Sequence, residues 1–186
     1  MKQLAIFDLD GTLFDTTRVN FLAYQQVLAP RGYYPEFDFF RRECFGHDYG
    51  YFGPLLALGA SPEELREIHR EKKICYASYL KYAVKNEHLF RLIHLMRSEY
   101  HTALVTAGSR ANSTDILTRF GEQDSFDLCL TAENVTKAKP DPQGFLKAME
   151  YFNVTPEQTI IFEDSPTGIK AAQASGATLF VVEGFN

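Results

Sequence analysis

The sequence predicts an α/β fold in which a parallel sheet carries helices on both faces and is interrupted near its start by an inserted block of helices. From about residue 86 onward, apolar runs typical of strands alternate with helical patterns, and such alternation builds a parallel sheet. A further apolar strand stands alone at the N-terminus, whereas residues 15–85 contain no convincing central strand. We therefore predict one core domain from residues 1–14 and 86–186 and an α-helical cap domain from residues 15–85.

The N-terminal strand is followed by the predicted insert. Leu4 to Phe7 form a short apolar run of the kind that lies buried in a sheet. Residues 17–29 predict a helix that stops near Pro30. Residues 61–64 have the sequence SPEE, a capping box with proline at the first helical position. This box predicts a long helix that runs to about Lys85.

The second half predicts four strands and four helices in alternation. The strands are apolar or β-branched runs at residues 102–106, 127–130, 159–162 and 178–182. The helices are expected at residues 87–100, 110–120, 142–152 and 166–175. Ser109 and Ser165 stand as helix N-caps, and Gly176 is a C-terminal stop. Apolar spacing gives two of the helices a buried face, made by Leu89, Ile93, Met96 and Tyr100 in the first case and by Phe145, Leu146, Met149 and Phe152 in the second.

Composition and charge narrow the possible functions. An apolar content of 45% and a charged content of 23% are ordinary for a globular protein. The net charge of −5 gives no support to binding of nucleic acid or of an anionic membrane through bulk electrostatics. No stretch approaches the length of a membrane span, and the first apolar run is too short for a secretion signal. Cys44, Cys75 and Cys129 form neither a metal signature nor a disulfide framework, which favours a reducing, cytoplasmic location.

Two acids follow the first strand, in the segment Asp8-Leu9-Asp10-Gly11-Thr12. Alternation along an extended chain points Asp8 and Asp10 to the same side. Carboxylates crowded at the end of a buried strand repel, so one pKa should rise or a cation should bind. The pair suits a nucleophile, an acid/base partner and a divalent metal. The alternative is an ordinary turn built on Asp-Gly.

A hydroxyl and a lysine follow the next two predicted strands. Thr106, with the backbone N–H groups that follow it near a helix start, makes a candidate anion site, and an ordinary helix cap is the alternative. Lys139 precedes Pro140, which holds it in an extended turn, where a fixed ammonium could neutralise phosphate charge. The alternative for Lys139 is a solvated surface lysine.

Two more acids, Glu163 and Asp164, end the apolar run of residues 159–162. Hard cations prefer such oxygen ligands, although acids also occur near helix N-termini for electrostatic reasons alone. All of these candidates fall at the carboxyl ends of parallel strands, where ligands of such sheets bind. Together they are the groups required for metal-assisted phosphoryl transfer through a carboxylate nucleophile.

With these motifs, the chain resembles the haloacid dehalogenase (HAD) superfamily in its helical-cap subgroup. FDLDGTLFDT matches the first motif of that family and LVTAGS the second. KAKPDPQGF matches the third, and IIFEDSPTGIKAAQASG matches the fourth together with the helix after it. The resemblance covers nearly the whole chain and implies a Rossmann-like core with Mg²⁺ as cofactor.

The resemblance also implies the roles of the reacting groups. Asp8 would be the nucleophile and Asp10 the general acid/base. Thr106, the backbone at Ala107 and Lys139 would bind the transferring phosphoryl group. Many relatives have Asn where this chain has Ala107, and we expect little effect because the backbone is the part used.

The metal ligands follow in the same way. Asp164 would ligate Mg²⁺ together with Asp8 and the backbone carbonyl of Asp10. Glu163 would support the metal through water.

The leading functional hypothesis is a Mg²⁺-dependent phosphatase that hydrolyses a small-molecule phosphate monoester, namely a sugar phosphate, phosphoglycolate or a nucleotide. The acid at Asp10 favours ester chemistry, since dehalogenases and phosphonate hydrolases of the superfamily lack an acid there and transport ATPases have Thr. A phosphomutase of the β-phosphoglucomutase type shares every catalytic residue named. A non-catalytic binding protein on the same fold is the third possibility. We expect a monomer or weak homodimer whose partner is the small-molecule substrate.

The resemblance implies that the insert closes over the leaving group and selects the substrate. Arg41, Arg42, His47 and Tyr49 lie in its irregular stretch, and we predict that one of them contacts the substrate. Solvated charges on a helix face are the alternative. The aromatic side chains of the same stretch are predicted to form the core of the insert rather than a binding platform; they are Phe39, Phe40, Phe45 and Phe52.

Overall fold

The computed structural model describes residues 2–47 and 59–184. The chain forms two compact units. The core unit consists of Met1–Asp15 and Val84–Asn186, and the helical insert consists of Thr16–Ala83. The predicted fold class, a parallel α/β core with an inserted helical cap, is confirmed.

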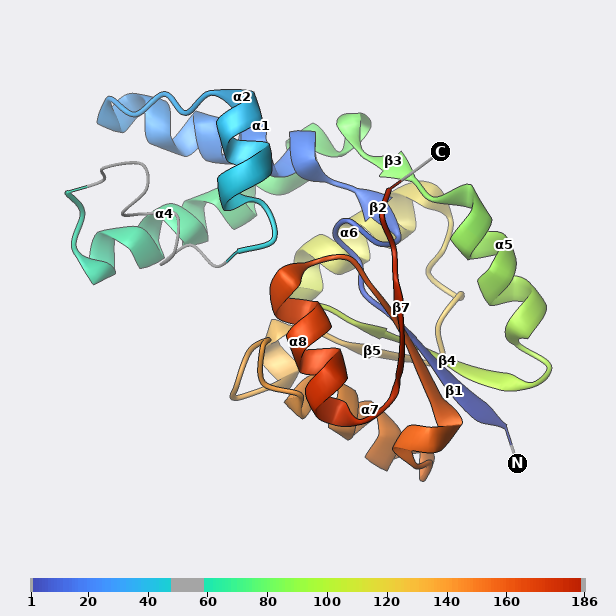
Figure 1. The fold of residues 1–186 in the computed structure, drawn as a ribbon. Helices are drawn as coiled ribbons and strands as arrows, with labels where there is room; N and C mark the ends of the chain where they lie inside the picture. The colour runs from blue at the N-terminus through green and yellow to red at the C-terminus, as the bar shows by residue number, and fades with distance from the viewer. Residues whose placement is uncertain (1, 48–58, 185–186) are drawn as a thin grey trace. The chain divides into compact units, whose positions relative to one another are not determined.

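The core unit is built on a five-stranded sheet (Figure 1). Its strands are β1 (Gln3–Phe7), β4 (Tyr100–Val105), β5 (Leu128–Leu130), β6 (Thr159–Glu163) and β7 (Thr178–Val181). The order is β5-β4-β1-β6-β7, and every pairing is parallel. Because the chain runs outward from β1 in both directions, β1 is the switch point beside which such sheets bind ligands.

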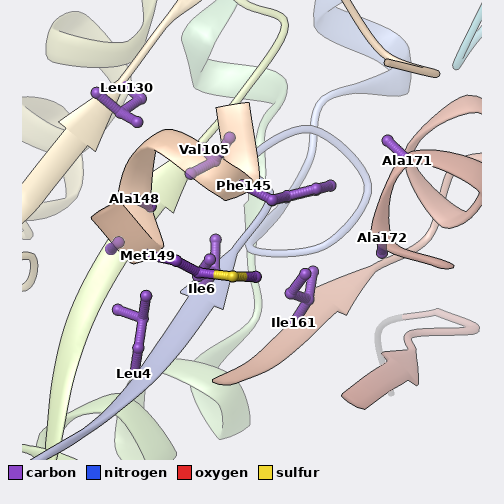
Figure 2. Packing of buried hydrophobic residues seen from close by; sticks show 11 residues of the cluster. Leu4, Ile6, Val105, Leu130, Phe145, Ala148, Met149, Ile161, Ala171 and Ala172 are labelled. Carbon is purple, nitrogen blue, oxygen red and sulfur yellow. The ribbon is translucent and has the colours of Figure 1, made fainter. Parts of the chain in front are cut away.

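Helices cover both faces of this sheet. They are α5 (Glu87–Met96), α6 (Arg110–Phe120), α7 (Gln143–Phe152) and α8 (Pro166–Ser175). Figure 2 shows α7 and α8 packed on one face, where Phe145 and Met149 lie against the strand residues Leu4, Ile6 and Ile161. On the other face, the rings of Phe7, Phe90 and Phe126 pack together. This alternation along β1 is the period-two pattern of a strand buried on both faces.

A two-stranded antiparallel ribbon marks where the chain leaves and re-enters the core. β2 (Phe14–Asp15) pairs with β3 (Val84–Lys85), with Phe14 opposite Lys85 and Asp15 opposite Val84. The core unit also contains two single 3₁₀ turns, η4 (Ala132–Asn134) and η5 (Pro156–Gln158).

All the regular secondary structure among the described residues of the insert is helical. It contains α1 (Thr17–Leu28), η1 (Ala29–Arg31), α2 (Phe37–Phe39), the π-helical turn η2 (Phe40–Cys44), α4 (Pro62–Cys75) and the 3₁₀ segment η3 (Tyr76–Tyr82). Ser61 and Glu64 form the predicted capping box of α4. Phe40 is buried, with Phe39 and Phe45 packed beside it, as predicted for the core of the insert. The predicted contributor Phe52 lies outside the described residues.

Three local predictions are wrong. The helix that begins after Ser61 does not reach Lys85, because the chain turns into η3 and then into β3, whose pairing with β2 overrides the helical pattern. The helix at 87–100 ends at Met96, and Tyr100 instead opens β4 opposite Gln3. Leu146 does not share the buried face of α7, since it is 44% exposed.

No helix among the described residues is long and apolar enough to cross a membrane.

Candidate active site

Acidic side chains gather at the carboxyl ends of two neighbouring strands of the core unit. Asp8 directly follows β1, and its N–H donates to the carbonyl of Phe162 in β6 at 3.0 Å. Glu163 is the last residue of β6, and Asp164 follows it. The carboxylates of Asp8, Glu163 and Asp164 each place an oxygen within 4.8 Å of the others. The structure therefore brings together three of the acids predicted from the sequence.

Lys139 joins this cluster from the loop before α7. Its ammonium donates to Asp8 Oδ1 at 2.6 Å, to the carbonyl of Val105 at 3.2 Å and to Glu163 Oε1. These three acceptors account for all three ammonium protons. The side chain of Lys139 is only 10% exposed, which excludes the alternative of a solvated surface lysine.

The donor set fits a hard divalent cation, although the three acids differ in what they can offer it. Glu163 Oε2 accepts hydrogen bonds from the Asp164 N–H, the Ser165 N–H and the Ser165 hydroxyl, while its Oε1 accepts from Lys139. A carboxylate has about four lone-pair positions, so these donors nearly saturate Glu163. Asp8 and Asp164 are therefore the better direct ligands, and Glu163 suits support through water.

Two glycines allow the acids to come this close. A Cβ on Gly168, in the first turn of α8, would lie 1.7 Å from Glu163 Oε1. A Cβ on Gly11 would lie 1.9 Å from Asp164 Oδ2, and Gly11 also has a positive φ of 93°. Any other residue at either position would push a carboxylate out of the cluster.

Burial and mutual repulsion shape the electrostatics of the site. Burial raises the pKa of Asp8 well above its usual range, Glu163 and Asp164 raise it further, and Lys139 opposes them. Burial likewise raises the pKa of Asp164 to about 7, against the hydrogen bond from Thr12. Burial alone would lower the pKa of Lys139, but the charges of Asp8 and Glu163 outweigh it and raise that pKa. The pKa of Asp8 is raised as expected, but burial is the main cause, and the carboxylates that repel it are Glu163 and Asp164. A bound cation would relieve that repulsion.

The turn after β4 supplies the predicted anion-binding groups. Thr106 is buried, and its Oγ1 accepts a hydrogen bond from the Gly108 N–H at 2.9 Å. Ala107 beside it is exposed, and Ser109 caps α6 as predicted. A Cβ on Gly108 would lie 3.2 Å from Thr106 Oγ1 and 3.6 Å from Asp10 Oδ2, which locates the Asp10 carboxylate near this turn.

A pocket of about 150 Å³ opens beside the same turn. Thr106 and Lys139 line it, and Val135 and Phe145 add apolar walls. The core unit can thus hold a small group next to the predicted phosphoryl-binding residues.

The residues predicted to contact substrate from the insert belong to the other compact unit. Arg41 and Arg42 are exposed on η2, and Arg41 lies 4.0 Å from Asp38. His47 is half-buried, and Tyr49 lies outside the described residues. Their contact with substrate stays a prediction.

Thr12 has a place in the site that sequence reasoning did not assign. It is fully buried, and its hydroxyl donates to Asp164 Oδ1 at 2.8 Å. The only sequence signal is its position inside the first motif, four residues after the nucleophile candidate Asp8.

Comparison with known proteins places this geometry in a family. Residues 5–182 match the family model of haloacid dehalogenase-like hydrolases. The chain belongs to this family. It is 32% identical to the validoxylamine A 7′-phosphate phosphatase of Streptomyces hygroscopicus subsp. limoneus, over 95% of this chain and 83% of that protein. It is 29% identical to the phosphorylated carbohydrates phosphatase of Thermotoga maritima, over 94% of this chain and 82% of the relative.

A solved structure has the same fold. The crystal structure of a β-phosphoglucomutase from Clostridium difficile superposes with a TM-score of 0.80 at 25% identity, covering 98% of this chain and 85% of that one. The predicted resemblance is thus confirmed, and this haloacid dehalogenase-like hydrolase has both phosphatases and phosphoglucomutases among its relatives. The predicted enzyme class, a hydrolase of phosphoric monoesters, is confirmed at the level of the family.

Proposed function

We propose that this haloacid dehalogenase-like hydrolase is a Mg²⁺-dependent phosphatase that acts on a small-molecule phosphate monoester. The observation that carries the proposal is the setting of the buried Asp8 carboxylate. Lys139 donates to it at 2.6 Å, and oxygens of Glu163 and Asp164 lie within 4.8 Å. A carboxylate can attack a phosphate dianion only where positive charge offsets their repulsion, and this site has a lysine and ligands for a cation.

Asp8 would attack the phosphorus in line. A bond forms from its carboxylate oxygen to phosphorus, the bond to the leaving oxygen breaks, and an aspartyl phosphate results. Thr106 and Lys139 would hold the equatorial oxygens, where transition-state charge gathers. The Thr106 oxygen already accepts the Gly108 N–H, so its own proton can be directed at the substrate.

Phosphoryl binding requires Lys139 to exchange one of its hydrogen bonds. All three ammonium protons have acceptors, and the bond to the carbonyl of Val105, at 3.2 Å, is longer than the bond to Asp8. A phosphoryl oxygen would replace that carbonyl, while the contacts with the two carboxylates persist.

Asp10 would protonate the departing alkoxide and then take a proton from the water that cleaves the aspartyl phosphate. Such acid/base help is typically worth ~10²–10⁴-fold in rate. Asp8, Asp164 and the backbone carbonyl of Asp10 would hold Mg²⁺, with Glu163 acting through water. When bound, the cation supplies Lewis-acid stabilisation of the negative charge on the phosphoryl oxygens.

We propose a sugar phosphate as the leading substrate class, ahead of phosphoglycolate and nucleotides. Support comes from the two relatives named as phosphatases of phosphorylated carbohydrates and of validoxylamine A 7′-phosphate. Arg41, Arg42 and His47 are the proposed substrate contacts from the insert.

The structural similarity to a β-phosphoglucomutase favours a second candidate, a phosphomutase. Both reactions pass through the same aspartyl phosphate. They differ in whether water or a sugar hydroxyl receives the phosphoryl group, so product analysis separates them.

The test is phosphate release from a panel of sugar phosphates, phosphoglycolate and nucleotides, with Mg²⁺ and with a chelator. We expect release that depends on Mg²⁺ and is greatest for a sugar phosphate. Conversion of a hexose phosphate to an isomer without free phosphate would establish the mutase instead. No turnover of any panel member with Mg²⁺ present would contradict both candidates.

A further inference from the structure

The Asp164 carboxylate is held in place from the first motif. Thr12 Oγ1 donates to Asp164 Oδ1 at 2.8 Å, and Gly11 packs so closely against Oδ2 that a Cβ there would lie 1.9 Å away. Thr12 is fully buried, so water does not compete for this hydrogen bond. The orientation of the carboxylate therefore depends on where the backbone of residues 11–12 lies.

A second residue, Asn86, fixes that backbone. Its side-chain Nδ2 donates to the carbonyl of Thr12 at 3.2 Å, and its own N–H donates to the carbonyl of Leu13 at 2.9 Å. Asn86 follows β3 directly and is 8% exposed. Two hydrogen bonds to adjacent carbonyls thus tie the first motif to the end of the β2–β3 ribbon.

Asn86 is itself anchored by a helix. Its Oδ1 accepts the N–H of Leu89 at 3.2 Å, as the N-cap of α5. The amide oxygen of Asn86 therefore caps α5, and the amide nitrogen donates to Thr12. An Asp at this position would keep the cap, since Asn and Asp are comparable N-caps, but would lose the N–H donor to Thr12.

We propose that Asn86 is a positioning residue for the metal-ligating carboxylate of Asp164 and that it acts through Thr12. The inference rests on the proposed function, in which Asp164 ligates Mg²⁺. Partners that orient a metal ligand without touching the metal typically contribute about 10–100-fold in metal affinity. Thr12 is such a partner of Asp164, and Asn86 lies one hydrogen bond further from the metal ligand.

The test measures Mg²⁺ affinity without substrate, from the rise in Tm as Mg²⁺ is added, and then kcat and KM across Mg²⁺ concentrations. Thr12→Val removes the hydroxyl at nearly constant shape and should weaken Mg²⁺ binding by about tenfold or more. Thr12→Ser keeps the hydroxyl and should retain most of the Mg²⁺ affinity that Thr12→Val loses. Asn86→Asp and the neutral Asn86→Ser should weaken it by about two- to tenfold, with kcat at saturating Mg²⁺ less affected than the Mg²⁺ requirement.

Ser61→Ala is the matched control, because it removes a helix N-cap from the insert. It should lower Tm while leaving the Mg²⁺ affinity unchanged. The double variant Thr12→Val with Asn86→Asp should bind Mg²⁺ no more weakly than Thr12→Val alone, since both changes break the same connection.

Three outcomes would overturn the inference. If wild-type protein binds Mg²⁺ and the Thr12 and Asn86 variants bind it equally well, the positioning role is wrong while the proposed function stands. If the two losses add independently, Asn86 does not act through Thr12. If wild-type protein binds no Mg²⁺ and releases no phosphate, the inference and the proposed function fail together.

Discussion

Replacement of Gly168 by alanine tests whether close backbone approach holds the acids of the candidate site in place. The added Cβ would lie 1.7 Å from Glu163 Oε1, whereas an ordinary contact begins at 3.4 Å, so the oxygen would have to move by about 1.7 Å. Glu163 is fully buried and has hydrogen bonds from Asp164, Ser165 and Lys139. A displacement of that size takes donors out of the 2.7–3.2 Å range of a normal hydrogen bond.

The energetic cost follows from the bonds that are lost. Two hydrogen bonds to a charged acceptor contribute about 1.5–3 kcal/mol each, and Gly→Ala in a helix would otherwise stabilise by about 0.4–1 kcal/mol. Gly168→Ala should therefore lower the free energy of unfolding by about 2–6 kcal/mol. Phosphatase activity should fall with it, because Lys139 loses a fixed partner.

Urea denaturation of four proteins makes the test decisive: wild type, Gly168→Ala, Glu163→Ala and the double variant. Without the Glu163 carboxylate the clash disappears, so Gly168→Ala should stabilise the Glu163→Ala protein by about 0.4–1 kcal/mol. The effect of Gly168→Ala on the free energy of unfolding would then have the opposite sign in the two backgrounds. Gly59→Ala, at an exposed glycine with nothing within 4 Å of the added Cβ, should change stability by less than about 0.5 kcal/mol. An equal loss in both backgrounds would refute the argument that Gly168 makes room for Glu163.

Other perturbations test the remaining charges. Asp8→Asn should abolish phosphate release with an unchanged circular dichroism spectrum, and sustained turnover would disprove the nucleophile assignment. Lys139→Met should lower the free energy of unfolding by about 3–5 kcal/mol near neutral pH, because it leaves the buried carboxylates of Asp8 and Glu163 without the lysine ammonium. That deficit should shrink as the pH falls, since the raised pKa of Asp8 lets it become neutral, and urea titrations at pH 5 and pH 8 with a chelator would show it. Burial would raise the pKa of Glu122, but hydrogen bonds from Lys85 and Ser125 outweigh it and lower that pKa. The ionised Glu122 therefore stabilises the fold above the pKa of about 4.3 that it has in the unfolded chain, and this stabilisation fades as the pH falls below that value. Glu122→Gln should therefore flatten the acid side of the stability–pH curve, and an unchanged slope would contradict this role.

The convergence of the acids could be predicted from the sequence because topology decides it. Asp8 and Asp164 each follow an apolar strand, and parallel strands place their carboxyl ends at one edge. The pattern of apolar runs in the sequence does not give the order of the strands in the sheet. That β1 lies between β4 and β6 emerges only from pairing across the chain, such as that of Ile6 with Ala103 and with Ile161.

Features that depend on a distant partner could not be predicted in the same way. Tyr100 fits a helical face as well as a strand, and only the register with Gln3 decides for the strand. The helix toward Lys85 has good propensity, but the two-residue pairing of β3 with β2 prevails over it. Asn is a preferred helix N-cap residue, so the cap at Asn86 is a local feature. Its hydrogen bond to the carbonyl of Thr12 depends on a residue 74 positions earlier in the chain.

The β2–β3 ribbon gives the core a ready-made junction for exchanging modules. Asp15 and Val84 lie opposite each other across the ribbon, although the whole insert lies between them in the chain. The two cut points of the insert are thus side by side, a spacing that a two-residue hairpin turn such as Asn-Gly can bridge. A shorter loop or an unrelated helical module could be grafted between them without altering the register of any strand in the five-stranded sheet, so the insert can be exchanged while the acidic cluster of the core keeps its framework.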